Sequence, residues 1–189
     1  SEAKKAQKMV VIDPKNDDFS YYQGADLITP NLKELAAAAK QKISAWPEIL
    51  AASQSLIKKY RLANLLVTRS QDGMSLIKQS GESENFPTKI REVYDVSGAG
   101  DTAIACLATA LGIKAKLKEA VFLANLAAGI AVTRLGTASI YRADLKNALI
   151  NRSLVSCQSK ILPEKIALEQ IKVWQMQGLR IGFTSGCFD

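Results

Sequence analysis

A glycine-rich turn carries the residues best suited to chemistry in this sequence. Residues 95–101 read DVSGAGD and lie between an expected strand over residues 92–96 and an expected helix. Gly98 and Gly100 let a ligand approach the main chain closely, and free amides at the start of the helix favour an anion there. A carboxylate at Asp101 could then accept a proton from a hydroxyl that attacks a terminal phosphoryl group. An ordinary tight turn with an acidic helix start explains the same residues.

Two further segments place polar side chains where a strand is expected to end. Asn31 and Glu34, in TPNLKE, offer oxygen ligands of the kind that magnesium prefers. A capping box at a helix start explains both residues equally well. Thr68, Ser70 and Gly73 follow a buried strand in a polar turn, which also suits a plain hairpin.

Alternating strand and helix patterns predict an α/β fold with a mostly parallel sheet covered by helices. The expected strands are residues 8–13, 26–29, 62–68, 74–78 and 92–96. The expected helices are residues 32–40, 46–60, 101–111, 117–135 and 164–177. The three polar segments all lie at carboxyl ends of expected strands or next to them. Because such ends share one edge of a parallel sheet, the sequence predicts that they form a single nucleotide site.

The sequence also predicts how the chain is organised. Residues 79–89 are polar and are expected to form a surface loop. The helices over 101–111 and 117–135 are apolar around most of their circumference, so both should be buried. A change of composition near residue 150 suggests a boundary. We expect a nucleotide-binding part over 1–150, a linker with an amphipathic helix over 151–178, and the first strand of another domain at 179–189, with that strand over Leu179–Phe183.

Composition excludes several classes of function. The net charge is +7, but the lysines and arginines are scattered and aromatic residues are scarce, which argues against a nucleic-acid binder. No apolar run reaches bilayer-spanning length, and the first ten residues lack the apolar core of a secretion signal. Three separated cysteines without any histidine do not form a structural zinc site. We expect a cytoplasmic protein without nucleic-acid or membrane partners.

Five motifs, in order, carry a resemblance to a known family: IDPK, TPNLKE, LLVTRSQDGMSL, VYDVSGAGDT and NLAAGIAVTRLGT. From about residue 8 the chain resembles the C-terminal two-thirds of a ribokinase-superfamily carbohydrate kinase. Within that superfamily it is similar to the bifunctional D-glycero-β-D-manno-heptose-7-phosphate kinase/heptose-1-phosphate adenylyltransferases, which supply ADP-heptose for lipopolysaccharide core synthesis. The final TSGCFD (Thr184–Asp189) looks like the opening of their nucleotidyltransferase domain, after a linker helix.

The resemblance implies ATP-dependent phosphorylation of heptose 7-phosphate at its anomeric hydroxyl. It implies that Asp101 is the catalytic base and that Gly98, Ala99 and Gly100 form the anion hole. The residues implied in ATP binding are Asn31, Leu32, Lys33, Glu34, Thr68, Ser70, Gly73, Asn125 and Gly129. Mg²⁺ would lie near Asn31 and Glu34, directly or through water, and a monovalent cation near Asp95 and Ser97.

Departures from that family's pattern limit what this chain is expected to do. The N-terminal portion with the sugar pocket is absent, and so is the H-x-G-H motif that should follow GCFD; Ser185 replaces an asparagine. We expect the chain to carry only the ATP side and the catalytic base, and to be inactive alone. The intact protein is expected to be a homo-oligomer that binds ATP and a sugar phosphate. Another sugar kinase of the superfamily, or a non-catalytic remnant of a broken gene, remains an alternative.

Overall fold

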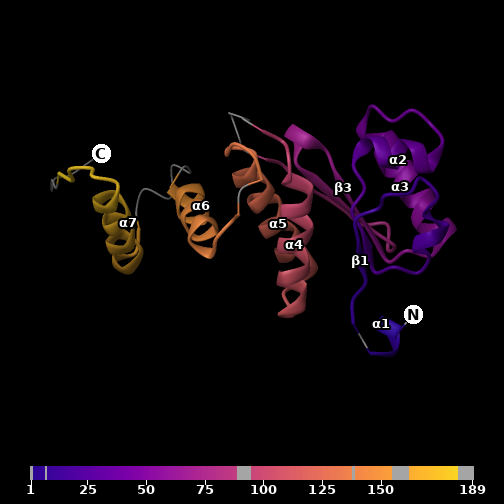
Figure 1. Ribbon diagram of the computed structural model, residues 1–189, viewed down its shortest axis with the longest axis horizontal. Coiled ribbons are helices and arrows are strands. Elements are labelled where there is room, and N and C mark those ends of the chain that lie inside the picture. Colours follow the sequence, from indigo (N-terminus) through magenta and orange to yellow (C-terminus); the bar gives the residue numbers. More distant parts are fainter. Residues whose placement is uncertain (1, 7, 89–94, 138, 155–161, 183–189) are drawn as a thin grey trace. The chain divides into compact units, whose positions relative to one another are not determined.

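The computed structural model describes the chain except for residues 1, 7, 89–94, 138, 155–161 and 183–189 (Figure 1). The chain divides into two compact units, Ser1–Tyr141 and Arg142–Asp189. Each unit is described by itself below.

The first unit is built on a five-stranded sheet with the strand order β1-β2-β3-β4-β5. The strands are β1 (Val11–Ile12), β2 (Leu27–Ile28), β3 (Asn64–Thr68), β4 (Met74–Lys78) and β5 (Ser83–Phe86). The first three strands are parallel, as the alternating pattern predicts, and β4 and β5 are added as antiparallel hairpins. The parallel part therefore brings the carboxyl ends of β1, β2 and β3 to one edge.

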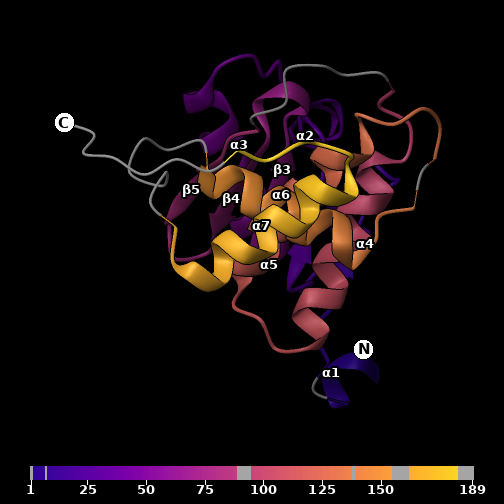
Figure 2. The ribbon, with the colours of Figure 1, turned by 90° about the vertical axis from the view of Figure 1, so that its left-hand side faces the viewer.

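Helices cover both faces of this sheet (Figures 1 and 2). One face packs against α2 (Leu32–Ala39) and α3 (Trp46–Tyr60), and the other against α4 (Ala99–Gly112) and α5 (Leu117–Ala131). Successive side chains of a strand point to opposite faces. Accordingly, Leu65 and Val67 of β3 lie in the α2/α3 core, whereas Leu66 lies in the α4/α5 core.

Local sequence explains where two of these helices begin. Asn31 precedes α2 and forms the predicted capping box with Glu34. Pro47 occupies the first turn of α3, where its missing N–H costs no hydrogen bond. The predicted bounds of α3, residues 46–60, are confirmed.

Two predictions about the first unit are wrong. The expected loop over 79–89 contains the strand β5, which the sequence hides because Phe86 is its only buried residue. Helix α4 was expected to be buried, but only Ala103, Leu107 and Ala110 of it are buried, because part of its apolar character comes from small alanines on its exposed face. The expected strand over 92–96 falls largely outside the described residues, and Asp95 and Val96 are not in a strand.

The second unit contains two helices, α6 (Arg142–Leu154) and α7 (Glu164–Met176). An ion pair of 3.1 Å joins Lys146 of α6 to Glu169 of α7. The expected strand over 179–183 is not observed, because residues 179–182 have no strand partner, and Phe183 lies outside the described residues. Helix α7 agrees with the predicted amphipathic helix to within one residue. Among the helices that the structure describes, none is long and apolar enough to cross a membrane.

Candidate active site

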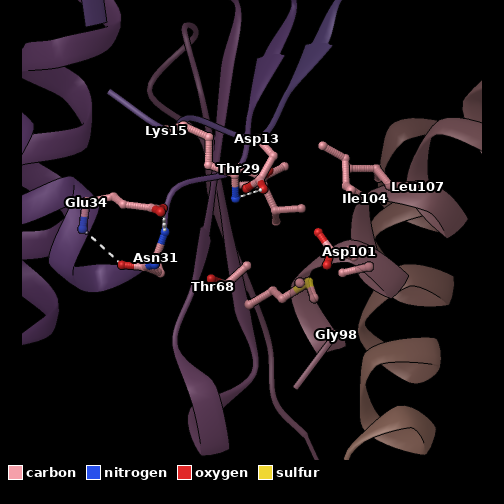
Figure 3. Close-up of a pocket in the computed structure, with 14 residues that line it drawn as sticks. Asp13, Lys15, Thr29, Asn31, Glu34, Thr68, Gly98, Asp101, Ile104 and Leu107 are labelled. Atoms are coloured by element: carbon pink, nitrogen blue, oxygen red, sulfur yellow. Dashed lines mark hydrogen bonds and ion pairs between the residues drawn. The ribbon is translucent and has the colours of Figure 1, made fainter. Parts of the chain in front are cut away.

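A cleft lies between the carboxyl ends of the parallel strands and the first turn of α4 (Figure 3). Its volume of about 230 Å³ is below the range of roughly 300–1,000 Å³ typical of pockets for whole small molecules. A cleft of this size suits one part of a small molecule rather than the whole of it. The lining residues are Asp13, Lys15, Thr29, Asn31, Glu34, Leu66, Thr68, Met74, Gly98, Gly100, Asp101, Ala103, Ile104 and Leu107.

Each parallel strand delivers polar residues to one wall of the cleft. Asp13 follows β1, Thr29 follows β2, and Thr68 ends β3. The wall is held together across the strands: the Thr29 amide donates to the Ile12 carbonyl at 2.9 Å, and Asn31 pairs with Thr68 as an isolated parallel bridge. Strand pairing therefore fixes this wall before any ligand is present.

The first turn of α2 forms part of the same wall and is closed by its own side chains. Asn31 Oδ1 accepts a hydrogen bond from the Glu34 amide at 2.9 Å, and Glu34 Oε2 accepts one from the Asn31 amide at 2.8 Å. Figure 3 shows these two bonds at the edge of the cleft. Glu34 Oε1 has no hydrogen bond to any residue that the structure describes. One oxygen of this carboxylate thus remains available to a ligand.

The first turn of α4 forms the opposite wall and has no side-chain cap. Gly98 precedes the helix with φ 76° and ψ 0°, a left-handed conformation that favours glycine. The amides of Gly100 and Asp101 have no acceptor among the described residues. Bare amides at a helix start, together with the helix dipole, bind anions. The Asp101 carboxylate stands beside them and is exposed (Figure 3).

Asp95 holds the turn that leads into α4. Its Oδ1 accepts a hydrogen bond from the Ser97 amide at 2.8 Å, and its Oδ2 accepts one from the Gly136 amide at 3.1 Å. These bonds, first those from Ser97 and then that from Gly136, hold the pKa of the Asp95 carboxyl below its usual value. An ionised Asp95 therefore ties the glycine turn to the segment after α5.

The charges lining the cleft are three carboxylates and one ammonium group. Asp13, Glu34 and Asp101 are the acids, and Lys15 is the only base among the lining residues that the structure describes. Lys15 Nζ donates to Asp13 Oδ2 at 2.6 Å. This hydrogen bond and the charge of Asp13 raise the pKa of Lys15, burial opposes them, and the charges of Glu34 and Asp101 add smaller raising effects. All three carboxylates therefore act on one lysine.

The residues present suit a magnesium ion only in combination with a ligand. No group of three or more acidic, histidine or cysteine side chains arranged to hold a metal occurs in the described part of the chain. Magnesium is usually bound by one or two carboxylates together with substrate phosphates and water. Glu34 Oε1 can supply such a carboxylate oxygen at the cleft edge, so the donor set fits an ion that arrives with a nucleotide.

The structure brings together the core of the predicted site but not all of it. Among the predicted residues, those lining the cleft are Asn31, Glu34, Thr68, Gly98, Gly100 and Asp101. The predicted residues that do not line it are Leu32, Lys33, Ser70, Gly73, Asp95, Ser97, Ala99, Asn125 and Gly129. Asn31 and Asp101, far apart in the sequence, line one cleft, as the convergence of the strand ends predicted.

Two of the predicted residues outside the cleft meet at a single backbone carbonyl. Asn125 Nδ2 donates to the Phe86 carbonyl at 3.1 Å and to the Pro87 carbonyl at 3.4 Å. Gly73 has φ 81°, and a Cβ atom there would lie 2.0 Å from the same Phe86 oxygen. The fold therefore accounts for an asparagine at 125 and a glycine at 73 without a ligand. The predicted contact of these two residues with a nucleotide stays a prediction.

Asp13, Lys15 and Thr29 line the cleft but were not among the predicted site residues. The signal that could have found them is the one that identified Thr68, since each follows the end of a parallel strand. Asp13 and Lys15 also flank a proline in the motif IDPK.

Comparison with known proteins assigns this arrangement to a family. Residues 1–143 match the model of the pfkB family carbohydrate kinases. The chain belongs to the pfkB family of carbohydrate kinases. The cleft described above is therefore that of a pfkB kinase, and the predicted enzyme class, a carbohydrate kinase by family, is confirmed.

Curated relatives extend the similarity along almost the whole chain. The chain is 46% identical over 187 residues to the bifunctional protein HldE of Paramagnetospirillum magneticum, which covers 99% of this chain and 38% of that protein. It is 47% identical over 180 residues to the bifunctional protein HldE of Rhodospirillum rubrum, covering 95% and 36%. This pfkB chain thus spans less than two-fifths of the length of the relatives it matches. The predicted resemblance to the bifunctional enzymes is confirmed.

Solved structures confirm the predicted ribokinase-like fold. Ribokinase from Thermotoga maritima matches with a TM-score of 0.67 and 28% identity, covering 78% of this chain and 50% of that one. Arabidopsis thaliana ribokinase complexed with ribose and ATP matches with a TM-score of 0.71 and 24% identity, covering 77% and 49%. At that identity the second match shows the fold alone.

Proposed function

We propose that this chain carries the ATP side of a kinase that phosphorylates heptose 7-phosphate at its anomeric hydroxyl. The product would be a precursor of ADP-heptose for the lipopolysaccharide core. The similarity to bifunctional HldE proteins over nearly the whole chain supports this substrate. Membership of the pfkB family supports ATP as the phosphoryl donor.

One observation carries the proposal: the first turns of α2 and α4 face each other across one cleft. Asn31 and Glu34 line one side, and Gly98, Gly100 and Asp101 line the other. Phosphoryl transfer requires a positioned base, donors for the charge of the moving group, and a place for the nucleotide. The two walls supply these three elements within one cavity.

The proposed mechanism gives each wall a separate task. Asp101 accepts the proton of the attacking hydroxyl, which makes that oxygen a better nucleophile. The amides of Gly100 and Asp101, with Gly98 and Ala99 shaping the turn, donate hydrogen bonds to the oxygens of the transferring phosphoryl group. The phosphate chain of ATP lies along the α2 side, between Asn31 and Thr68. Leu66, Met74 and Leu107 form the apolar floor of the cleft.

Metal ions complete the proposed site. Glu34 would hold Mg²⁺ together with the ATP phosphates, with Asn31 nearby, and the ion would neutralise phosphate charge when bound. We also propose a monovalent cation near Asp95 and Ser97. The lowered pKa of Asp95, caused by hydrogen bonds from Ser97 and Gly136, keeps a negative charge there.

We further propose that the adenine side of the nucleotide reaches past the cleft. Leu32, Lys33, Ser70 and Gly73 would flank it, and Asn125 and Gly129 would approach the base. The acceptor sugar would be held by sequence outside this chain, since the chain spans 38% of the HldE relative from P. magneticum. In this scheme residues 1–150 belong to the kinase, 151–178 form a linker, 179–189 begin a nucleotidyltransferase domain, and the full-length protein is a homo-oligomer.

The test uses the full-length protein that contains residues 1–189. It is incubated with ATP, Mg²⁺ and heptose 7-phosphate, and the product is analysed by ³¹P and ¹H NMR. We expect a second phosphate bonded to the anomeric carbon. Fructose 6-phosphate and ribose serve as competing acceptors. A higher kcat/KM for either of them would show that the substrate is misassigned, although the enzyme class would stand.

A further inference from the structure

Lys15 occupies a position in the cleft that the proposed mechanism does not yet use. It is the only cationic side chain among the described residues that line the cleft, and the three carboxylates Asp13, Glu34 and Asp101 surround the same space. In Figure 3, Lys15 and Asp13 lie at the strand ends, on the side opposite Asp101. In the proposed mechanism the transferring phosphoryl group passes between the α2 and α4 walls, so a cation that lines this cleft is placed to contact it.

We propose that Lys15 is a phosphate-contacting residue, whose ammonium group leaves Asp13 and binds the terminal phosphoryl group of the bound nucleoside triphosphate. This inference rests on the proposed function. The lysine ammonium group is a compact charge with three hydrogen-bond donors on a flexible side chain. It can therefore follow a phosphoryl group whose position changes during transfer. Asp13 holds the ammonium in the cleft until the nucleotide binds.

The ion pair with Asp13 is weak enough to be exchanged. Its Nζ–Oδ2 distance is 2.6 Å, but the Lys15 side chain is 76% exposed and that of Asp13 is 25% exposed. Pairs of exposed charges contribute little to stability because water competes for both partners. A phosphate carrying more than one negative charge is a stronger partner for the same ammonium group. The exchange therefore needs no rearrangement of the fold.

The backbone at Lys15 is fixed although its side chain is exposed. The hydroxyl of Tyr22 accepts hydrogen bonds from the Lys15 amide at 3.0 Å and from the Asn16 amide at 2.9 Å. Tyr22 ends the short 3₁₀ helix η1 (Phe19–Tyr22), and its ring packs edge-on against fully buried Phe19, with centroids 5.8 Å apart. Tyr22 is therefore a positioning residue that aims Lys15 into the cleft.

The sugar phosphate is the other phosphate that Lys15 could bind, and position favours the nucleotide. Lys15 lines the same cleft as Glu34 on the α2 wall and Asp101 on the α4 wall, so its ammonium group can reach a phosphoryl group held between the proposed metal side and the proposed base. In the proposed mechanism the terminal phosphoryl group lies there, whereas a phosphate at the far end of the acceptor sugar lies away from the reacting hydroxyl.

The experiment compares Lys15→Met and Lys15→Arg in the full-length protein. Affinities for ATP, ADP and sugar phosphate are measured by isothermal titration calorimetry, and turnover is measured with saturating substrates. We expect Lys15→Met to weaken ATP binding by about 10- to 100-fold while ADP binding changes less than about threefold, because only the contact to the third phosphate is lost. Lys15→Arg should recover part of the ATP affinity, since it retains the charge.

A second pair of variants tests the positioning role. Tyr22→Phe removes the acceptor for two backbone amides and should lower the ratio of ATP to ADP affinity by about 3- to 10-fold. Tyr21→Phe is the matched control, because Tyr21 is in the same short helix but is 74% exposed. If Tyr22→Phe lowers thermal stability without changing that ratio, Tyr22 is only structural.

The remaining outcomes separate this proposal from the proposed function. An unmodified protein that binds no ATP would refute the function and the role of Lys15 together. If the unmodified protein works and Lys15→Met keeps its ratio of ATP to ADP affinity, the role of Lys15 alone is refuted. It is also refuted if Lys15→Met weakens ATP and ADP equally, or weakens only the sugar phosphate.

Discussion

The helices α2 and α4 begin on opposite walls of the same cleft, and they begin differently. Helix α2 has a complete capping box, in which Asn31 and Glu34 satisfy each other's backbone amides at 2.9 and 2.8 Å. Helix α4 begins at a left-handed glycine, Gly98, with no side-chain cap. A side-chain cap is worth about 1 kcal/mol, so leaving it out costs stability. The uncapped start of α4 keeps its donors for a ligand.

This contrast indicates which helix start has hydrogen-bonding groups left for a ligand and which has already satisfied its own. The α2 start is complete without a ligand, apart from one oxygen of Glu34. The α4 start is incomplete, and its acidic residue, Asp101, is exposed and unpaired within the described chain. We therefore propose that the α4 start carries the chemistry and that the α2 start supports the nucleotide. Each prediction below tests one side of that assignment.

The largest effect is expected at Asp101. Asp101→Asn keeps the shape of the side chain but cannot take a proton, so turnover of the full-length protein should fall by about 10³-fold. ATP affinity should change less than about threefold, because the amides of the α4 turn remain. Asp17→Asn, at an exposed residue outside the cleft, is the control. Loss of ATP binding together with turnover would give Asp101 a structural role instead.

A smaller effect is expected from the two glycines of the α4 turn. Gly98→Ala puts a residue with a side chain in the left-handed region and places its Cβ 3.3 Å from Thr137 Cγ2. The free energy of unfolding should therefore fall by about 1–2 kcal/mol. Gly100→Ala meets no atom within 4 Å and should leave stability unchanged or raise it by up to about 1 kcal/mol. Urea denaturation of both variants measures this. Equal destabilisation would mean that the turn is not shaped as described.

The smallest effect is expected on the α2 side. Asn31→Ala removes the acceptor for the Glu34 amide and should cost about 1 kcal/mol of unfolding free energy. Asn31→Asp keeps an oxygen acceptor and should lower the unfolding free energy by only a few tenths of a kcal/mol. Thermal unfolding of the two variants, followed by circular dichroism, tests the difference. If alanine and aspartate behave alike, the capping box does not stabilise α2.

Sequence alone predicted the elements with strong local signals. Pro47 and the following apolar pattern defined α3, and Asn31 with Glu34 defined the start of α2. Strand β5 was missed because SENF is mostly polar, and it forms only by pairing with β4. Helix α6 was missed because its composition, RADLKNALINRSL, is polar on average.

The site was predictable in outline for a different reason. Glycine turns and strand ends mark ligand positions in α/β proteins, so Asp101, Asn31 and Thr68 could be named from sequence. The proposed role of Lys15 could not be inferred in this way, because the Tyr22 hydroxyl that holds the backbone at Lys15 and Asn16 belongs to a separate helix. Gly73 and Asn125 likewise meet only through the Phe86 carbonyl of β5.

Hydrogen–deuterium exchange of the full-length protein tests most directly whether both helix starts hold one nucleotide. Exchange is compared without ligand, with ADP and with a non-hydrolysable ATP analogue, each with Mg²⁺. Residues 29–35 should gain protection with either nucleotide. Residues 97–103 should gain protection chiefly with the ATP analogue, because only it brings a third phosphate to the free amides of α4. No change in residues 97–103 with the ATP analogue would contradict the assignment of phosphoryl transfer to the α4 turn.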